Sequence, residues 1–500
     1  MARVIFLLGT LLTVALAGAV NAASLADSPG AIDAFAGKPR LFVLTDIGNE
    51  PDDQMSLVRL LLYANDLDLE GLVATTSTWQ RAKVQPQMLL EVIRAYGEVQ
   101  PNLLQHSRDY PAAAVLEKLV SSGPAGYGLA GIQRGKLSSG AAALLAAADR
   151  NDPRPLWITV WGGANTLAEA LGHLRATRPK DLDAIVARLR VYGISDQDDA
   201  GPWIRREFPK LFYVVKPSTP DSGEYGTATW TGISGDVFYA NCDGADPGLV
   251  TNQWLDDHIR GRSALGRHYP RFAFIMEGDT PSFLGLLANG LESFRSPSWG
   301  GWGGRYVWRQ PYGETHALWT QGGDVYPRVT SRDAVVGIDD KLHTSDQATV
   351  WRWRAAYQND FAARMDWTTK DFQSANHAPT VVVAGAAGRT VVYANANVGQ
   401  PLSFDATGTK DPDGNALRYH WFHYPEAGFV PGGALADISL SGADTPRVTV
   451  TPTAACRPDW LKSNKTCREG VAHLILAVTD DGTPALTSYR RVILDVREAR

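Results

Sequence analysis

Three aspartates stand close together near the start of the chain, where a strand pattern changes to a helix pattern. Asp46 follows the apolar run 41–44, and Asp52 and Asp53 come just before the periodic apolar positions of 55–62. Aspartate in the first turn of a helix commonly caps the helix or complements its dipole. Asp46 has no such explanation, because it ends a strand, where aspartate is disfavoured.

The position of these carboxylates predicts a site for a hard cation. In an open sheet of parallel strands, ligands bind beyond the carboxyl ends of the strands. Calcium takes several oxygen ligands, and loops of this kind supply them. We therefore expect a Ca²⁺ site at the end of the first strand, with helix capping as the alternative for Asp52 and Asp53.

The segment 41–62, LFVLTDIGNEPDDQMSLVRLLL, resembles the opening of the nucleoside hydrolase family, in which the first strand ends in the motif D-x-G-x-D-D. The loop here is two residues longer than the family's. The resemblance implies that Asp46 and Asp53 bind calcium and that Asp46 also activates the attacking water. It implies that Asp52 contacts sugar hydroxyls.

Two later segments resemble the places where the family finds its other calcium ligands. The segment 158–167, ITVWGGANTL, resembles a strand-to-helix turn that offers a backbone carbonyl, here that of Trp161. The segment 274–284, FIMEGDTPSFL, resembles the late strand with the last calcium carboxylate, which implies Asp279, with Glu277 as the alternative. The family's histidine acid has no counterpart beside Asp279. Glu50, Glu277 and the loop 196–199 remain alternatives for the leaving-group acid.

The family's asparagine and glutamate sugar contacts are not matched residue by residue, so we expect a rebuilt substrate pocket. The segment 297–305, PSWGGWGGR, places tryptophan between glycines. Flat rings complement the C–H faces of sugars, although glycine also permits a tight buried bend. The residues predicted to bind substrate are Asp52, Asn49, Glu50, Ser77, Asn165, Asp196, Glu277, Trp299 and Trp302.

Apolar strand-like runs alternate with helical stretches from residue 41 to about 287, which is typical of an open, mostly parallel α/β sheet with flanking helices. The predicted strands are 41–45, 69–75, 155–160, 189–194, 211–215 and 272–276. The predicted helices include 141–148, 164–174, 281–291 and 347–365. Together with the motifs, this pattern predicts a nucleoside hydrolase-like domain over 38–373.

From residue 380 onward, short alternating strands separated by turn residues predict an all-β, immunoglobulin-like sandwich over 380–500. The segment 402–421 resembles PKD and cadherin-like modules, in which a tryptophan fills the core. The acidic residues in the turns of this segment are typical of turns in general, or alternatively they form a second calcium site. The two-domain order resembles the exported branch of the nucleoside hydrolase-like superfamily.

The first residues indicate export. Arg3, an apolar run over 4–19 and small residues up to Ala22 predict a signal peptide over 1–22. No other stretch is apolar for long enough to span a membrane, so we expect a periplasmic or secreted protein. Export and proximity in sequence predict a disulfide bond between Cys456 and Cys467, with Cys242 left as a buried thiol.

The resulting functional hypothesis is an exported, calcium-dependent hydrolase of N- or O-glycosyl bonds. Its partner would be a nucleoside, a furanosyl sugar, an oligosaccharide or a polysaccharide fragment. A net charge of -5 and the absence of basic runs argue against a nucleic-acid polymer as partner. The alternative is a noncatalytic carbohydrate-binding protein, which would not need a metal-ligating carboxylate at the position of Asp46.

Overall fold

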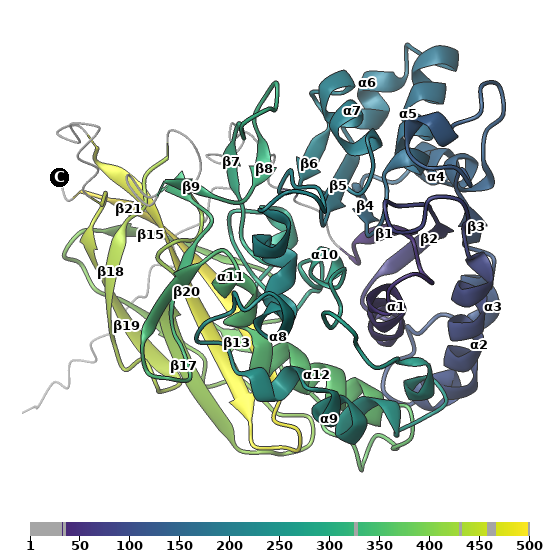
Figure 1. Ribbon diagram of the computed structural model, residues 1–500. Helices are drawn as coiled ribbons and strands as arrows, with labels where there is room; N and C mark the ends of the chain where they lie inside the picture. The colour runs from purple at the N-terminus through teal and green to yellow at the C-terminus, as the bar shows by residue number, and fades with distance from the viewer. Residues whose placement is uncertain (1–32, 34–36, 325–328, 430–432, 458–466, 499–500) are drawn as a thin grey trace, which may run out of the picture.

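The computed structural model describes residues 33, 37–324, 329–429, 433–457 and 467–498. Its N-terminal part is built on an eight-stranded sheet of order β3-β2-β1-β4-β5-β6-β8-β7, in which only β7 and β8 pair antiparallel (Figure 1). The strands are β1 Arg40–Thr45, β2 Asp68–Ala74, β3 Val120–Ser122, β4 Leu156–Val160, β5 Leu189–Gly193, β6 Phe212–Val214, β7 Val307–Arg309 and β8 Leu318–Thr320. The carboxyl ends of β1 to β6 therefore share one edge.

Helices cover both faces of this sheet. The α-helices are α1 Asp52–Leu62, α2 Pro86–Leu103, α3 Ala113–Glu117, α4 Ser139–Asp149, α5 Asn165–Thr177, α6 Leu182–Val186, α7 Ala200–Glu207, α8 Gly235–Phe238, α9 Asn252–Leu255, α10 Pro281–Leu284, α11 Ala348–Trp351 and α12 Arg354–Asp366. Because side chains alternate along a strand, Leu41 and Val43 join the core of α1 and α2, whereas Phe42 and Leu44 join the core of α4 and α5. The predicted mostly parallel α/β fold is confirmed.

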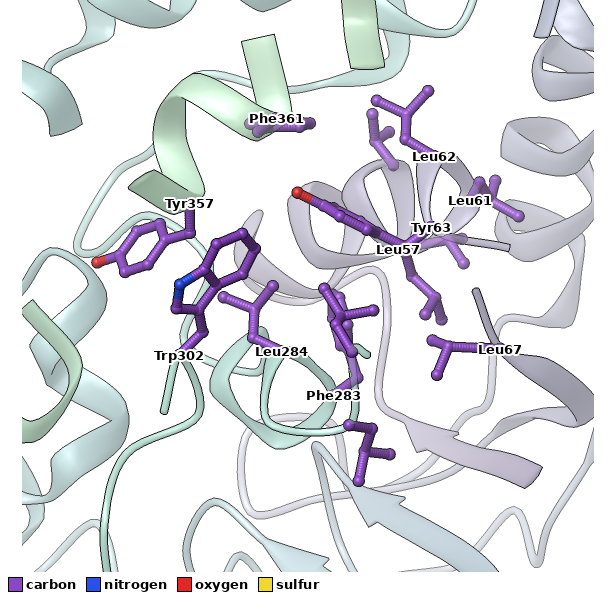
Figure 2. Packing of buried hydrophobic residues seen from close by; sticks show 14 of the residues in the cluster. Leu57, Leu61, Leu62, Tyr63, Leu67, Phe283, Leu284, Trp302, Tyr357 and Phe361 are labelled. Atoms are coloured by element: carbon purple, nitrogen blue, oxygen red, sulfur yellow. The ribbon is translucent and has the colours of Figure 1, made fainter. Parts of the chain in front are cut away.

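Helix α1 is held by packing on a late part of the chain. Figure 2 shows Leu57 of α1 near Phe283 and Leu284 of α10, and Leu61 of α1 and Phe361 of α12 belong to the same cluster. All of these side chains are fully buried or nearly so. The hydrophobic core therefore fixes the start of α1 relative to the segment that precedes α10, and these two places carry the predicted calcium ligands.

The C-terminal part contains a four-stranded sheet of order β15-β21-β20-β17 and a three-stranded sheet of order β16-β19-β18. Its strands are β13 Val382–Val383, β14 Ala386–Ala387, β15 Val392–Asn397, β16 Leu402–Asp405, β17 Leu417–His423, β18 Asp437–Ser441, β19 Arg447–Ala454, β20 Glu469–Asp480 and β21 Thr487–Arg497. Trp421 is buried in the core between them, as predicted. Cys456 and Cys467 form the predicted disulfide bond, and Cys242 is a buried free thiol.

The β domain packs directly on the α/β domain. In strand β21, the amides of Tyr489 and Arg491 donate to the carbonyls of Asn289 (3.0 Å) and Gly290 (3.1 Å). Gly290 has a φ of +96°, and an added Cβ would lie 1.8 Å from the carbonyl oxygen of Tyr489, so this close approach requires glycine. Three small two-stranded sheets complete the fold: β9 Gly323–Asp324 with β10 Val329–Thr330, β11 Asp333–Val336 with β12 Leu342–Ser345, and β13 with β14.

Two predicted elements are wrong. The segment 272–276 is not a strand: Phe274 is 49% exposed, and Glu277 adopts a left-handed φ of +59° that ends any extended run. The predicted helix 281–291 ends at Leu284, and the chain then turns through Gly285 toward the β domain. The predicted signal peptide lies outside the described residues, and the boundary between the domains near residue 380 stays a prediction. No helix in the described part of the chain is long and apolar enough to cross a membrane.

Candidate active site

Four aspartates meet at the carboxyl edge of the parallel sheet. Asp46 follows β1, Asp52 and Asp53 open α1, and Asp279 precedes α10. Asp52, Asp53 and Asp279 each place a carboxylate oxygen within 4.8 Å of the other two. The Thr45 hydroxyl donates to Asp53. The structure therefore brings together the residues that the sequence assigned to calcium, and it adds Asp52 to the same cluster.

Within the described residues, none of the four aspartates of this cluster forms an ion pair with lysine, arginine or histidine, so no cation of that part of the chain balances their charge. Burial, with Glu50 nearby, raises the pKa of Asp46 to about 6. Burial and the charges of Glu50 and Asp46 raise that of Asp52 to about 7. Burial and the neighbouring aspartates raise the pKa of Asp53 and of Asp279 well above the usual range. Such a cluster is costly when ionised and empty.

The donor set fits a calcium ion. One oxygen each of Asp46 and Asp279, Oδ2 in both, is buried without a hydrogen-bond partner. The carbonyl of Trp161 accepts a hydrogen bond from Nε2 of Gln197 at 2.7 Å, so it is held in a fixed direction and keeps one lone pair. At Gly162, an added Cβ would lie 2.5 Å from Oδ1 of Asp46, so only glycine leaves room for this carboxylate.

Neighbouring loops hold the acidic turn in place. Gln80 donates through Nε2 to the carbonyl of Asp46 (2.9 Å), and Gln85 donates to that of Gly48 (2.9 Å). Ser77, a predicted substrate contact, is fully buried; its hydroxyl accepts from the amides of Trp79 (3.0 Å) and Gln80 (3.1 Å), and its interaction with Asp46 lowers the pKa of that carboxyl. These contacts fix the backbone of the longer loop and keep Ser77 beside Asp46.

The other residues predicted to bind substrate differ in how exposed they are and in whether the protein already hydrogen bonds to them. Asn49 is exposed and Glu50 is half-buried, so both remain accessible at the mouth of the cluster. Asn165 is fully buried: its Nδ2 donates to Oγ1 of Thr76 (2.9 Å), and its Oδ1 lacks a partner. Asp198, which the sequence analysis named only as part of a loop, accepts from the amide of Asn165 (3.1 Å), and burial raises its pKa to about 7.

Glu277 and Asp196 are wrong as predicted substrate-binding residues, because each carboxylate is already paired with an arginine. Glu277 is fully buried in an ion pair with Arg59 (Nε to Oε2, 2.5 Å) and also accepts from the hydroxyl of Tyr269 (2.5 Å). Asp196 accepts two hydrogen bonds of 2.8 Å from Arg205. Both carboxylates have each oxygen engaged inside the fold, so Asp279 rather than Glu277 stays the predicted late calcium ligand.

The tryptophans of segment 297–305 are also wrong as a sugar platform. Trp299 is 3% exposed and Trp302 is 2% exposed. Trp302 packs edge-on against Tyr357 and against Tyr489 of β21, and Figure 2 shows it inside the core beside Tyr357 and Leu284. The glycines of this segment let it form a buried bend under the β domain, which was the alternative explanation.

Comparison with known proteins gives two family matches. The family described as "Cellulose-binding Sde182, nucleoside hydrolase-like domain" matches residues 40–306, and that described as "Cellulose-binding protein Sde0182, C-terminal domain" matches residues 401–496. A nucleoside hydrolase-related protein from Saccharophagus degradans, described as associated with carbohydrate metabolism, has a solved structure. It is 33% identical over 92% of this chain and 100% of its own, with a TM-score of 0.75. No curated protein matches the chain significantly.

Two further solved structures align less well. The PKD domain of the KIAA 1837 protein is 17% identical over 21% of this chain and 81% of its own, with a TM-score of 0.15. The type III effector XopQ complexed with adenosine diphosphate ribose is 13% identical over 67% of this chain and 95% of its own, with a TM-score of 0.30. Neither TM-score is high enough to support a conclusion about this chain.

Proposed function

Because the chain belongs to the Sde182 nucleoside hydrolase-like family, we propose that it is an exported, calcium-dependent hydrolase of glycosidic bonds. Its substrate would be a nucleoside or an oligosaccharide. The observation that carries this proposal is the uncompensated acidic cluster, in which Asp46 and Asp279 each keep a buried oxygen without a partner. A structural role would not require four carboxylates to face one another without a cation.

Bound Ca²⁺ would neutralise the aspartates and orient both a water molecule and two vicinal sugar hydroxyls. Asp46 would then accept the proton of the attacking water, with Ser77 beside its carboxylate. The water oxygen bonds to the anomeric carbon, and the bond to the leaving group breaks with its electron pair. The neighbouring carboxylates stabilise the positive charge that develops on the sugar ring.

The departing group needs a proton, and Glu50 is the best-placed donor. Glu277 is paired with Arg59, and the loop 196–199 is engaged throughout: Asp196 is paired with Arg205, and Asp198 and Asp199 accept hydrogen bonds from backbone amides. Glu50 is half-buried at the mouth of the cluster, and burial raises its pKa above the usual value for glutamate. A raised pKa keeps part of the population protonated and able to act as a general acid.

Kinetics of two variants test these roles. Asp46→Asn should lower kcat/KM for inosine and for cello-oligosaccharides by about 100-fold or more. Glu50→Gln should slow the same substrates strongly but leave 4-nitrophenyl glycosides little affected, because nitrophenolate leaves without a proton. Glu224→Gln, an exposed glutamate on another loop, is the matched control. Equal rates for Asp46→Asn and the wild-type protein would contradict the mechanism.

A noncatalytic carbohydrate-binding protein is the second candidate, and the family's description as cellulose-binding supports it. Sedimentation with insoluble cellulose, followed by analysis of released sugars, separates the two. The hydrolase proposal expects reducing sugar or free base in the presence of calcium. Tight binding by both the wild-type protein and Asp46→Asn, with no product released from any substrate, would favour the binding protein.

A further inference from the structure

A group of aromatic side chains lies beside the acidic cluster, on segments that are far from it in the sequence. Five rings contact one another in a continuous chain, which we call the aromatic ledge. The ring centroids are 5.0 Å apart for Tyr225 and Trp230, 5.9 Å for Trp230 and Tyr239, 4.9 Å for Tyr239 and Phe238, and 5.3 Å for Phe238 and Phe274. The ledge thus extends from the 3-10 turn at Tyr225–Thr227 through α8 to the segment before Asp279.

The ledge and the acidic cluster share a wall. At Gly278, an added Cβ would lie 2.8 Å from Oδ2 of Asp52 and 3.2 Å from Cε3 of Trp230, so only a glycine separates the carboxylate from the ring. The charge of Asp52 also acts on the hydroxyls of Tyr225 and Tyr239. Trp230 is therefore the ring beside Asp52, and Tyr239 and Phe238 extend the ledge outward from it.

The outer part of the ledge is open to solvent. Phe238 is 53% exposed and Phe274 is 49% exposed, whereas Tyr225 and Tyr239 are half-buried and Trp230 is buried. The buried ring anchors the ledge in the fold, and the outer rings present their surfaces to water. Exposed rings grouped at the mouth of a polar site are typical of a binding surface.

The chemistry of this surface selects its ligand. Apolar ring faces stack on the C–H faces of sugars, and the tyrosine hydroxyls and Asp52 hydrogen bond to sugar hydroxyls. The ledge itself carries no cationic side chain that would pair with a phosphate or carboxylate group, so its chemistry fits a neutral ligand. The ledge also continues over several rings, which is more surface than one nucleobase covers.

We propose that the aromatic ledge is a subsite for a neutral oligosaccharide, whose sugar rings stack on Phe238 and Phe274 while the terminal sugar reaches Asp46 and Asp52. This inference rests on the proposed function and specifies its substrate class as a glycan. The exposed rings of the ledge thereby take the stacking role predicted from the sequence for Trp299 and Trp302, which are buried.

Isothermal titration of the full chain with cellopentaose, in the presence of calcium, tests the proposal. The variant Phe238→Ala/Phe274→Ala should raise the Kd at least about tenfold, since it removes two stacking rings. Its calcium affinity should stay unchanged, because neither ring offers a ligand. Tyr312→Ala, which removes a fully exposed ring in the turn between β7 and β8, is the control and should bind as the wild-type protein does.

Equal cellopentaose affinity for the double variant and the wild-type protein would overturn the proposal. So would a wild-type protein that binds inosine but not cellopentaose, or that binds neither. Phe274→Leu keeps the apolar volume and gives the same comparison if the double variant does not fold. Calcium binding and turnover are measured separately, so the proposed subsite can be rejected without rejecting the proposed hydrolase activity. Loss of sugar binding in a protein that takes up no calcium would instead support the ledge and reject the hydrolase.

Discussion

Arg59 and Glu277 form a fully buried ion pair that joins helix α1 to the segment carrying Asp279. Nε of Arg59 lies 2.5 Å from Oε2 of Glu277, and both side chains are completely inaccessible to solvent. The Arg59 guanidinium also lies over the ring of Phe361, 3.9 Å from its centroid. Since Asp53 and Asp279 flank this pair in sequence, the pair positions the acidic cluster without belonging to it.

Breaking this pair should destabilise the protein and weaken the metal site together. Glu277→Gln leaves Arg59 buried and unpaired, which should cost about 3 to 5 kcal/mol of unfolding free energy. Urea unfolding in the presence and absence of calcium measures both effects. The double variant Arg59→Met/Glu277→Gln should lose less than the single variant. A single variant with unchanged stability would contradict the structural role of the pair.

Bound calcium should stabilise the protein more at high pH than at low pH. Burial and mutual repulsion raise the pKa of Asp46 to about 6 and that of Asp52 to about 7. A raised folded-state pKa means that the metal-free protein keeps its stability at low pH and loses it as the pH passes through this range. The fall in Tm on adding a chelator should therefore be larger at pH 8 than at pH 5.5. A chelator effect that is equal at both pH values would contradict this linkage.

The interface between the domains should be sensitive to acid. His473 is buried, its Nδ1 accepts from Arg491 at 2.7 Å, and burial together with the charge of Arg491 lowers its pKa well below the usual value. A lowered folded-state pKa means that stability is lost as the pH falls below about 6.5, by up to about 1.4 kcal/mol per unit. The ring of Trp299 packs against His473, so the loss should loosen the domain contact.

Urea unfolding at pH 5 and pH 7.5 measures this dependence, and His473→Gln is the informative variant. Glutamine can still accept from Arg491 but does not titrate, so the variant should lose less stability than the wild-type protein between the two pH values. Carboxylate titration affects both proteins alike and cancels in the comparison. Equal pH dependence would show that His473 is not the sensitive group.

Trp302 should stabilise the fold and have no direct part in binding. Removing its buried ring leaves a cavity between Tyr357 and Tyr489, and a tryptophan-to-alanine change of this kind costs about 3 to 5 kcal/mol. Thermal unfolding of Trp302→Ala should show a lower Tm, with an unchanged Kd for cellopentaose measured below that temperature. An unchanged Tm with weaker sugar binding would restore the original sugar-platform hypothesis.

The parts of the site that could be predicted are formed by residues that lie close together in the sequence. Asp46, Asp52 and Asp53 stand at one strand-to-helix turn, and such turns gather at one edge of a parallel sheet, so both the fold and the acidic cluster could be inferred. The buried ion pair of Glu277 could not be inferred, because its partner Arg59 is 218 residues away in the sequence. The Trp–Gly pattern of 297–305 is compatible with an exposed platform and with a buried bend, and only the packing of the β domain decides between them.

The aromatic ledge could not be predicted from the sequence for a related reason. Tyr225, Phe238 and Phe274 are spread over three segments with no shared periodicity, and Phe274 was placed in a strand that does not form. The one local signal is the aromatic content of 225–239, YGTATWTGISGDVFY, which is equally compatible with a hydrophobic core. Proximity to Asp52 arises only from the tertiary fold.

Calorimetric titration of the chelator-treated protein with calcium chloride at pH 7.5 shows whether the acidic cluster binds calcium. We expect binding at one site in the wild-type protein, with affinity lost in Asp53→Asn and in Asp279→Asn. Asp199→Asn, which changes an exposed carboxylate outside the cluster, should bind as the wild-type protein does. A wild-type protein that produces no binding heat and no rise in Tm with calcium would show that the cluster is not a calcium site and leave Asp52 and Asp53 with only a helix-dipole role.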